Sequence, residues 1–238
     1  MSCQGDSGFG KRVAILEAWI ATSRDRFTGA DFNFLTEVLA GGEKRLCMAK
    51  LWDDPDALRE MLDLKRVLRG ILDSPSALRV SPDFYFYVLI RHAFKQAGIS
   101  DPEMADYVSR VMAQRLAVQK NDPMHDIANG YTHASDFLAV ISSAQGRMKF
   151  HLQVAAGNQF MVLTGLFPAF INRRNQRHGA PDLAFYESFA RRSFQGAADS
   201  SCGYGKVPRH LLGSLAEALP DARKSLNRVA EEFVFLGD

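Results

Sequence analysis

Apolar residues recur along this chain at the three-to-four-residue spacing of amphipathic helices, and no segment has the pattern of a convincing hairpin. We expect a first helix over residues 11–20 and a second over 31–39, with Asp31 as its cap. Asp54-Pro55-Asp56 places an acidic cap before a proline in the first turn, which predicts one helix from there to Ile71.

A run of bulky residues at 84–90 has the composition of a strand, but its surroundings indicate a helix. Ser81-Pro82-Asp83 is a strong helix start, and the apolar spacing continues to Gly98. Because the run is apolar on all sides, we expect this helix to be buried in the middle of the fold. The same cap chemistry at residues 100–103 predicts a further helix that ends near Val118.

The second half of the chain contains a helix near 134–145 and a long apolar helix from about 147 to 171. Residues 154–171 raise the question of a membrane span, but polar residues and a proline interrupt them, and their length is at the short limit for crossing a bilayer. We therefore expect a buried central helix, which Pro168 kinks or ends just after Phe167.

Two glycines and a basic cluster distinguish this helix and the residues after it. Gly157 and Gly165 lie on nearly the same face and would let a neighbouring helix approach closely. Basic residues follow the helix end and precede Gly179, as helix C-termini favour. They are Arg173, Arg174, Arg177 and His178, with Arg191 and Arg192 one helix later.

Pro181-Asp182 begins a helix rich in aromatic residues that runs to about Ala197, and a Gly/Ser loop then leads to two final helices. The predicted fold class is all-α, with about nine to eleven helices arranged around two buried central helices. We predict a single domain over residues 1–238, in which 1–10 are disordered and 119–135 form the longest loop.

The composition is that of an ordinary globular protein and excludes a disordered, a collagenous or a disulfide-rich chain. The 238 residues are 47% hydrophobic and 24% charged, so the chain can bury a large core without disulfides. Because 29 basic residues face 27 acidic ones, the net charge of +2 predicts no general attraction to nucleic acid or to an anionic membrane. Cys3, Cys47 and Cys202 are widely spaced, which favours a reduced compartment. With no secretory pattern at the N-terminus, we expect a cytoplasmic location.

Familiar catalytic motifs are missing from the sequence. The glycine loop at 202–207 lacks the first glycine and the Ser or Thr of a phosphate-binding loop, so we expect a connection between helices. No His-Glu-x-x-His or Glu-x-x-His pair indicates a zinc or di-iron centre, and no Gly-x-Ser-x-Gly indicates a hydrolase. His151, alone on an apolar helix, is expected to be structural, and we expect no cofactor.

One pair of residues, His125-Asp126, resembles part of the HD superfamily of all-helical phosphohydrolases, which have a His, a later His-Asp pair and a distant Asp. His92 would supply the first ligand, and Asp136 or Asp182 the last. Such ligands would hold a divalent metal that lowers the pKa of bound water. Against this, the pair lies in a polar stretch where the superfamily has an apolar helix. A phosphohydrolase using His92, His125 and Asp126 is therefore the alternative function.

A candidate anion pocket lies near the start of the aromatic helix. Arg173 and Arg174 should emerge close to Pro181-Asp182, where a helix N-terminus offers unpaired N–H groups and positive potential. Tyr186, about one turn into that helix, would donate a hydrogen bond to a carboxylate or phosphate. In the alternative arrangement, Asp182 caps the helix and itself neutralises the arginines.

Residues 163–168, Leu-Thr-Gly-Leu-Phe-Pro, are followed by Arg173-Arg174 and then by a helix that contains Phe185, Tyr186, Phe189 and Phe194. This order resembles an uncharacterised family of bacterial all-helical proteins, in which a Gly-Leu-Phe-Pro helix end precedes a basic stretch and an aromatic helix. Residues 81–112 are similar to an upstream part of that family, so the resemblance covers roughly residues 80–200. It implies a bacterial origin and transfers no activity.

We expect a protein that works by binding rather than by catalysis. The chain has 17 phenylalanines and a basic helix end, and its sequence contains no recognisable set of catalytic residues. The expected partner is another protein chain, including a second copy of this one, or a small apolar or anionic ligand. Nucleic acid is not expected, because no short turn in the predicted fold joins a basic recognition helix.

Overall fold

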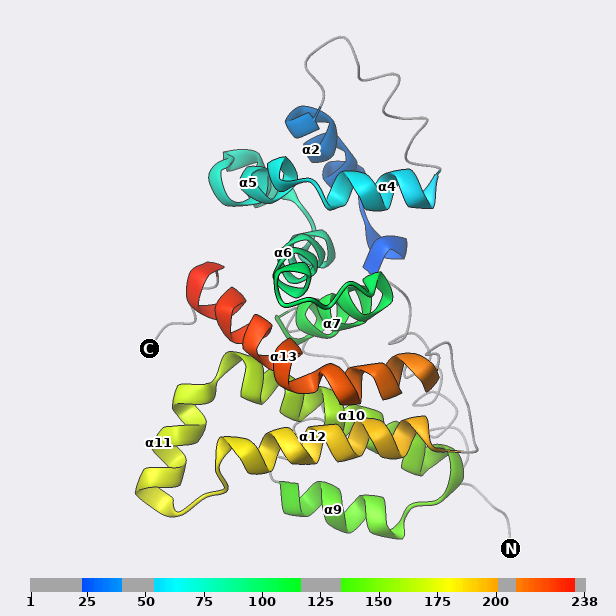
Figure 1. Ribbon diagram of the computed structural model, residues 1–238, viewed down its shortest axis with the longest axis vertical. Helices are drawn as coiled ribbons and strands as arrows, with labels where there is room; N and C mark the ends of the chain where they lie inside the picture. The colour runs from blue at the N-terminus through cyan, green and yellow to red at the C-terminus, as the bar shows by residue number, and fades with distance from the viewer. Residues whose placement is uncertain (1–22, 40–53, 117–133, 201–208, 234–238) are drawn as a thin grey trace, which may run out of the picture. The chain divides into compact units, whose positions relative to one another are not determined.

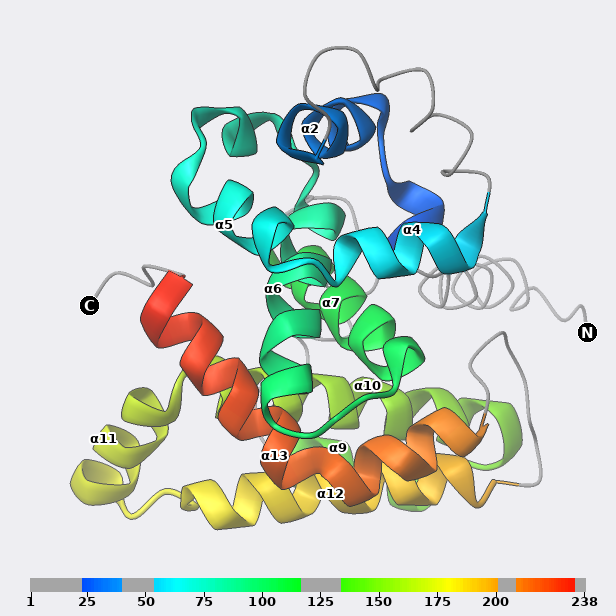
Figure 2. The same cartoon turned by 45° about the horizontal axis from the view of Figure 1, so that its top comes forward.

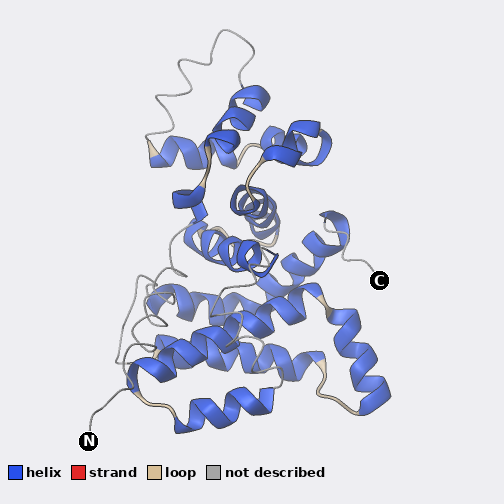
Figure 3. Cartoon of the chain, turned by 180° about the vertical axis from the view of Figure 1, so that it is seen from behind, coloured by secondary structure: helices blue, strands red, loops and turns tan. Residues whose placement is uncertain are grey.

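The computed structural model describes residues 23–39, 54–116, 134–200 and 209–233. These residues form ten α-helices and two 3-10 helices with no strand among them, and 87% of them are helical (Figure 3). The predicted all-α class is confirmed, and the described part alone has a helix number within the predicted range. The predicted helix 11–20, the terminal residues 1–10 and nearly all of the predicted loop 119–135 lie outside the described residues.

The contacts within the chain gather into two compact units. The described residues of Thr22–Ala117 and those from Arg228 onward form what we call the N-terminal unit. The described residues of Val118–Asn227 form what we call the C-terminal unit. Each unit contains one of the two helices predicted to be central and buried. The single domain predicted for residues 1–238 stays a prediction.

The N-terminal unit is built around α6, the helix predicted from the aromatic run. In chain order its helices are η1 (Ser23–Arg26), α2 (Gly29–Leu39), α4 (Pro55–Leu62), α5 (Lys65–Asp73), η3 (Pro75–Arg79), α6 (Pro82–Gln96) and α7 (Pro102–Leu116) (Figure 1). Phe84, Tyr87 and Ile90 of α6 are completely buried. Ser81 caps this helix as predicted, because its Oγ accepts a hydrogen bond from the Phe84 N–H at 3.1 Å.

The helix predicted from Asp54 to Ile71 is in fact two helices, α4 and α5, and this prediction was wrong in its length. Asp54 caps α4 as expected, but the helix ends at Asp63. The Asp63 carboxylate accepts hydrogen bonds from Arg91 at 2.8 and 3.0 Å and from Lys95 at 2.9 Å, both on α6. These contacts reach across 28 or more residues of sequence, so local periodicity could not reveal them.

The C-terminal unit is built around α10, the long apolar helix. Its helices are α9 (Ala134–Ser143), α10 (Gly146–Leu166), α11 (Pro168–His178), α12 (Leu183–Ala198) and α13 (Arg209–Phe233), of which the last passes into the N-terminal unit at Arg228. Figures 1 and 2 show α10 and α12 lying side by side along their length.

The predicted glycines allow the close helix packing of this unit. A Cβ atom on Gly157 would lie 2.6–2.8 Å from the Phe194 ring of α12, and one on Gly165 would lie 2.9 Å from the Leu226 side chain of α13. Close approach is therefore confirmed, although the two glycines admit two different neighbouring helices.

Residues 209–233 form one helix where the sequence predicted two. Pro220 lies inside α13, and its missing N–H removes one hydrogen bond of the regular helix. The helix continues because the side chains on one of its faces are buried on both sides of the proline. They are Leu212, Leu215, Ala216, Leu219, Ala222 and Leu226.

No single helix among the described residues has the length and the hydropathy needed to span a membrane. In the described part of the chain, α10 and α11 taken together meet both requirements, and this pair is bent by 91° at the break between them.

Candidate functional site

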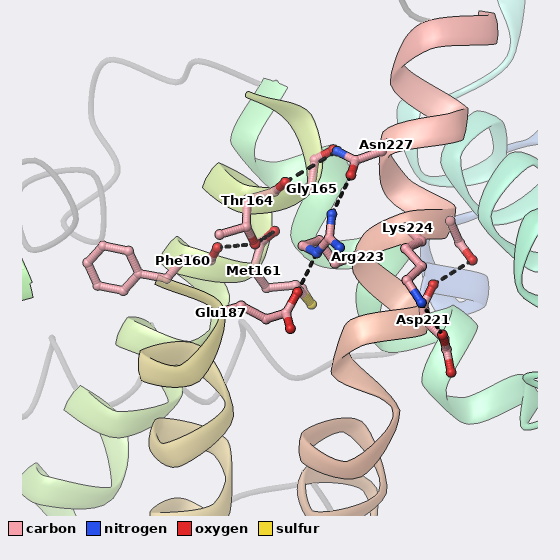
Figure 4. Close-up of polar contacts among 10 residues, drawn as sticks. Phe160, Met161, Thr164, Gly165, Glu187, Asp221, Arg223, Lys224 and Asn227 are labelled. Carbon is pink, nitrogen blue, oxygen red and sulfur yellow. Dashed lines mark hydrogen bonds and ion pairs between the residues drawn. The ribbon is translucent and has the colours of Figure 1, made fainter. Parts of the chain in front are cut away.

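The break between α10 and α11 determines where the predicted basic residues lie, because they follow it on α11. Pro168 ends α10 as the sequence predicted, and a second helix starts at the proline itself. Because Pro168 has no N–H, the carbonyl of Thr164 lacks its regular helical donor. The amide of Asn227 on α13 supplies one, donating to the Thr164 carbonyl at 3.2 Å and also to the Gly165 carbonyl (Figure 4).

A chain of polar groups holds Asn227 in this position. The Asn227 amide oxygen accepts a hydrogen bond from Arg223 at 2.7 Å, and the same guanidinium pairs with Glu187 of α12 (Figure 4). The helices α10, α12 and α13 are thus joined at the point where α11 departs. This network fixes the end of α10 and the start of α11.

The outer face of α11 carries the basic residues predicted from the sequence. Ile171 is the buried residue of this helix, whereas Phe170, Arg173 and Arg177 are exposed and Arg174 is half-buried. Phe170, Arg173, Arg174 and Arg177 follow the spacing i, i+3, i+4, i+7, so they form one stripe along the helix. We call these four residues the basic face.

No acidic side chain of the described residues pairs with the basic face. The α11 sequence contains no Asp or Glu, and within the described residues its three arginines form no ion pair. The Arg174 guanidinium lies 5.6 Å from the centre of the Phe170 ring, a cation–π distance. The face therefore combines three available cations with an exposed aromatic ring.

The residues of the predicted anion pocket lie on two helices, α11 and α12. Asp182 caps α12, because its carboxylate accepts a hydrogen bond from the Phe185 N–H at 2.8 Å. This is the alternative arrangement that the sequence allowed for the cap. Tyr186 is buried and its ring stacks on Phe160 of α10 at 5.4 Å. Arg173 and Arg174 lie on the basic face of α11, in the middle of a helix rather than beyond a helix end.

A groove lies between α9 and α12, with α10 at its side. Its volume is about 510 Å³, and its apolar lining includes Leu138 and Ile141 of α9 with Phe185 and Phe189 of α12. Gln153 and Arg192 add polar groups to the lining. Sequence patterning could not predict this groove, because nothing in the sequence indicates that α9 and α12 face each other.

Of the three residues of the alternative metal site, the structure describes His92. His92 is buried, and its Nε2 donates to the carbonyl oxygen of Leu62 at 3.2 Å, a structural role. His125 and Asp126 lie outside the described residues. Among those that are described, no group of three His, Cys, Asp or Glu side chains is suited to hold a metal ion. The phosphohydrolase prediction is therefore not tested.

Burial and charge act on the groups around His92. Burial lowers the pKa of His92, since the uncharged imidazole is favoured away from water. Burial alone would raise the pKa of Asp63, but the hydrogen bonds and charges of Arg91 and Lys95 outweigh it and lower this pKa. Burial thus favours the uncharged form of His92, whereas the contacts with Arg91 and Lys95 favour the ionised form of Asp63.

Comparison of this sequence with protein-family models, with curated proteins and with solved structures gave no match in any of the three. The resemblance of residues 80–200 to a family of bacterial helical proteins stays a prediction.

Proposed function

We propose that this chain acts by binding an acidic segment of a partner protein along the basic face of α11. The observation that carries the proposal is the stripe itself: one exposed phenylalanine and three arginines at i, i+3, i+4, i+7, with no acidic residue on the helix. A structural role is poorly supported, because Ile171 makes the buried contact of α11 whereas Phe170, Arg173 and Arg177 are exposed.

The residue types favour a protein partner. Arginine and aromatic residues are enriched in protein interfaces, whereas lysine is depleted, and α11 contains three arginines and no lysine. A planar guanidinium binds a carboxylate through two parallel hydrogen bonds. Exposed Phe167, which immediately precedes α11, and Phe170 provide apolar area beside these charges. A partner should therefore present carboxylates next to an apolar side chain.

The spacing favours a helical partner segment. Phe170, the adjacent pair Arg173 and Arg174, and Arg177 follow one another at intervals of about one turn, or 5.4 Å along the helix. Carboxylates at i and i+4 of a second helix repeat with the same period. An amphipathic acidic helix can thus place one carboxylate opposite the Arg173–Arg174 pair and the next opposite Arg177.

Nucleic acid and membranes fit this surface less well. The whole chain has a net charge of only +2, so it lacks the extended positive potential that concentrates a protein on a polyanion. An interfacial membrane helix presents a broad apolar face, whereas the apolar Ile171 side of α11 is packed inside the unit. We further propose that the protein is bacterial and acts in the cytoplasm, as expected from the sequence.

The test uses a fluorescent synthetic helical peptide that carries Glu at i and i+4 beside leucines. The full chain is titrated into this peptide, and binding is measured by fluorescence anisotropy. We expect saturable binding that weakens with salt. Replacing Arg173 and Arg177 with alanine should reduce the affinity roughly tenfold, given 0.2–1 kcal/mol or more for each exposed pair. Arg191→Ala, on an exposed position of α12, is the matched control and should leave binding unchanged.

Three further measurements separate the other partners. A single-stranded oligonucleotide and anionic vesicles should bind more weakly than the peptide at equal salt. Sedimentation of the wild-type chain and of the double arginine variant shows whether the partner is a second copy. Tighter binding of the oligonucleotide or of the vesicles would overturn the proposal, as would equal peptide affinity in the double variant and in Arg191→Ala.

A further inference from the structure

The groove between α9 and α12 is a second place where the C-terminal unit leaves apolar side chains open to solvent. Leu138 is 51% exposed and Phe185 41% exposed, although both line a concave surface. A volume of about 510 Å³ lies within the range of small-molecule sites, 300–1,000 Å³. This groove is separate from the basic face, because none of the residues of α11 lines it.

The two ends of the groove carry opposite charges, from Asp182 and Arg192. Phe185, Phe189 and Arg192 follow one another at i, i+4, i+7 on α12, so the arginine lies about 10 Å along the helix from the first aromatic ring. The carboxylate at the opposite end, on Asp182, is used to cap α12. The charge available to a ligand is therefore positive and sits at the Arg192 end.

No ion pair or hydrogen bond with another described residue accounts for the position of the Arg192 side chain. Within the described part of the chain it forms no ion pair or hydrogen bond, and its side chain is exposed. Gln153 of α10 lines the same groove and offers an amide donor. Ser193 is not free in the same way, because its hydroxyl donates to the Phe189 carbonyl at 2.8 Å.

We infer that this groove binds a small amphipathic anion. Its apolar body lies against Leu138, Ile141, Phe185 and Phe189, and its carboxylate or other anionic head pairs with Arg192. Charge complementarity selects the anion, and the volume selects a small molecule over a docked helix, which needs a longer surface. This site is independent of the function proposed for α11.

The probe is dodecanoate, titrated into the full chain by calorimetry below its micelle concentration. We expect saturable binding with one site per chain. Dodecyltrimethylammonium, with the same apolar body and the opposite charge, should bind at least tenfold more weakly. Arg192→Gln should weaken dodecanoate binding roughly tenfold, the usual loss of a charge-assisted hydrogen bond. Arg191→Gln changes the neighbouring exposed arginine and should have no effect.

A second pair of variants tests the apolar wall. Leu138→Asp alters a half-exposed lining residue and should abolish dodecanoate binding, whereas Met148→Asp, at a similarly exposed position outside the lining, should retain it. The inference is overturned if both detergents bind equally, if Arg191→Gln weakens binding as much as Arg192→Gln, or if dodecanoate does not bind. It is also overturned if Leu138→Asp only dissociates a dimer of the chain. None of these variants changes α11, so this test and that of the basic face fail separately.

Discussion

Asn227 is the residue that lets a proline-broken helix remain buried. A buried carbonyl without a donor costs about 1–3 kcal/mol, and Asn227 donates to two carbonyls at the end of α10. Asn227→Ala should therefore lower the free energy of unfolding by about 1–3 kcal/mol in a denaturant titration. Asn172→Ala, at an exposed position on α11, should change it by less than about 0.5 kcal/mol. Equal effects of the two substitutions would show that the Asn227 contacts contribute nothing.

His92 makes the stability of the chain depend on pH. Because burial lowers its pKa in the folded chain, the unfolded chain binds more protons once the pH falls below about 6.5, the ordinary value for histidine. The free energy of unfolding should therefore decrease as the pH is lowered from 7.5 to 5.5. His92→Gln should show a smaller decrease, and His178→Gln, at an exposed site, should behave like the wild type. Parallel pH profiles for all three proteins would contradict this role of His92.

At the scale of single helices, glycine positions decide how closely α10 can be approached. Gly157→Ala and Gly165→Ala place a Cβ atom within 2.9 Å of a neighbouring side chain, so each should lower the free energy of unfolding by about 1–3 kcal/mol. Gly213→Ala on α13 meets only Ala198, at 3.8 Å, and should raise it by about 0.5–1 kcal/mol through helix propensity. Thermal melting of the three variants checks the prediction. Stabilisation of all three would show that α10 is not closely packed.

Three helix starts were predictable from the sequence because a cap acts within one turn. The predicted cap Asp31 was wrong, since α2 begins at Gly29 and the Asp31 carboxylate accepts hydrogen bonds from Thr28 and Ser81 instead. Asp54, Ser81 and Asp182 all accept hydrogen bonds from their own helices, as the local pattern predicted. The end of α4 at Asp63 and the continuity of α13 through Pro220 depend on side chains far away in sequence, and both were missed.

The candidate sites follow the same rule. The arginines of the basic face were recognised as a cluster because they are neighbours in sequence. Phe170 and the stripe were missed, because the sequence analysis did not place these residues on a helix of their own. The groove depends on α9 and α12 both packing against α10, which no spacing within one helix reveals.

At the scale of the whole molecule, the helix content is a direct check of the fold class. The described residues are 87% helical and make up most of the chain. Far-ultraviolet circular dichroism of the full chain should therefore indicate more than about 60% helix, well above the third that is usual for globular proteins. A spectrum dominated by sheet would contradict the fold, beginning with the aromatic helix α6.

If the charges of α11 select an acidic partner, exchanging those charges should exchange the preference for the partner. The full chain with Arg173→Glu and Arg177→Glu is titrated with two helical peptides of identical pattern, one with Glu and one with Lys at the charged positions. We expect the wild type to prefer the Glu peptide and the double variant to prefer the Lys peptide, each by at least about tenfold. If both proteins bind the two peptides in the same order, the basic face does not select the partner and the proposed function is wrong.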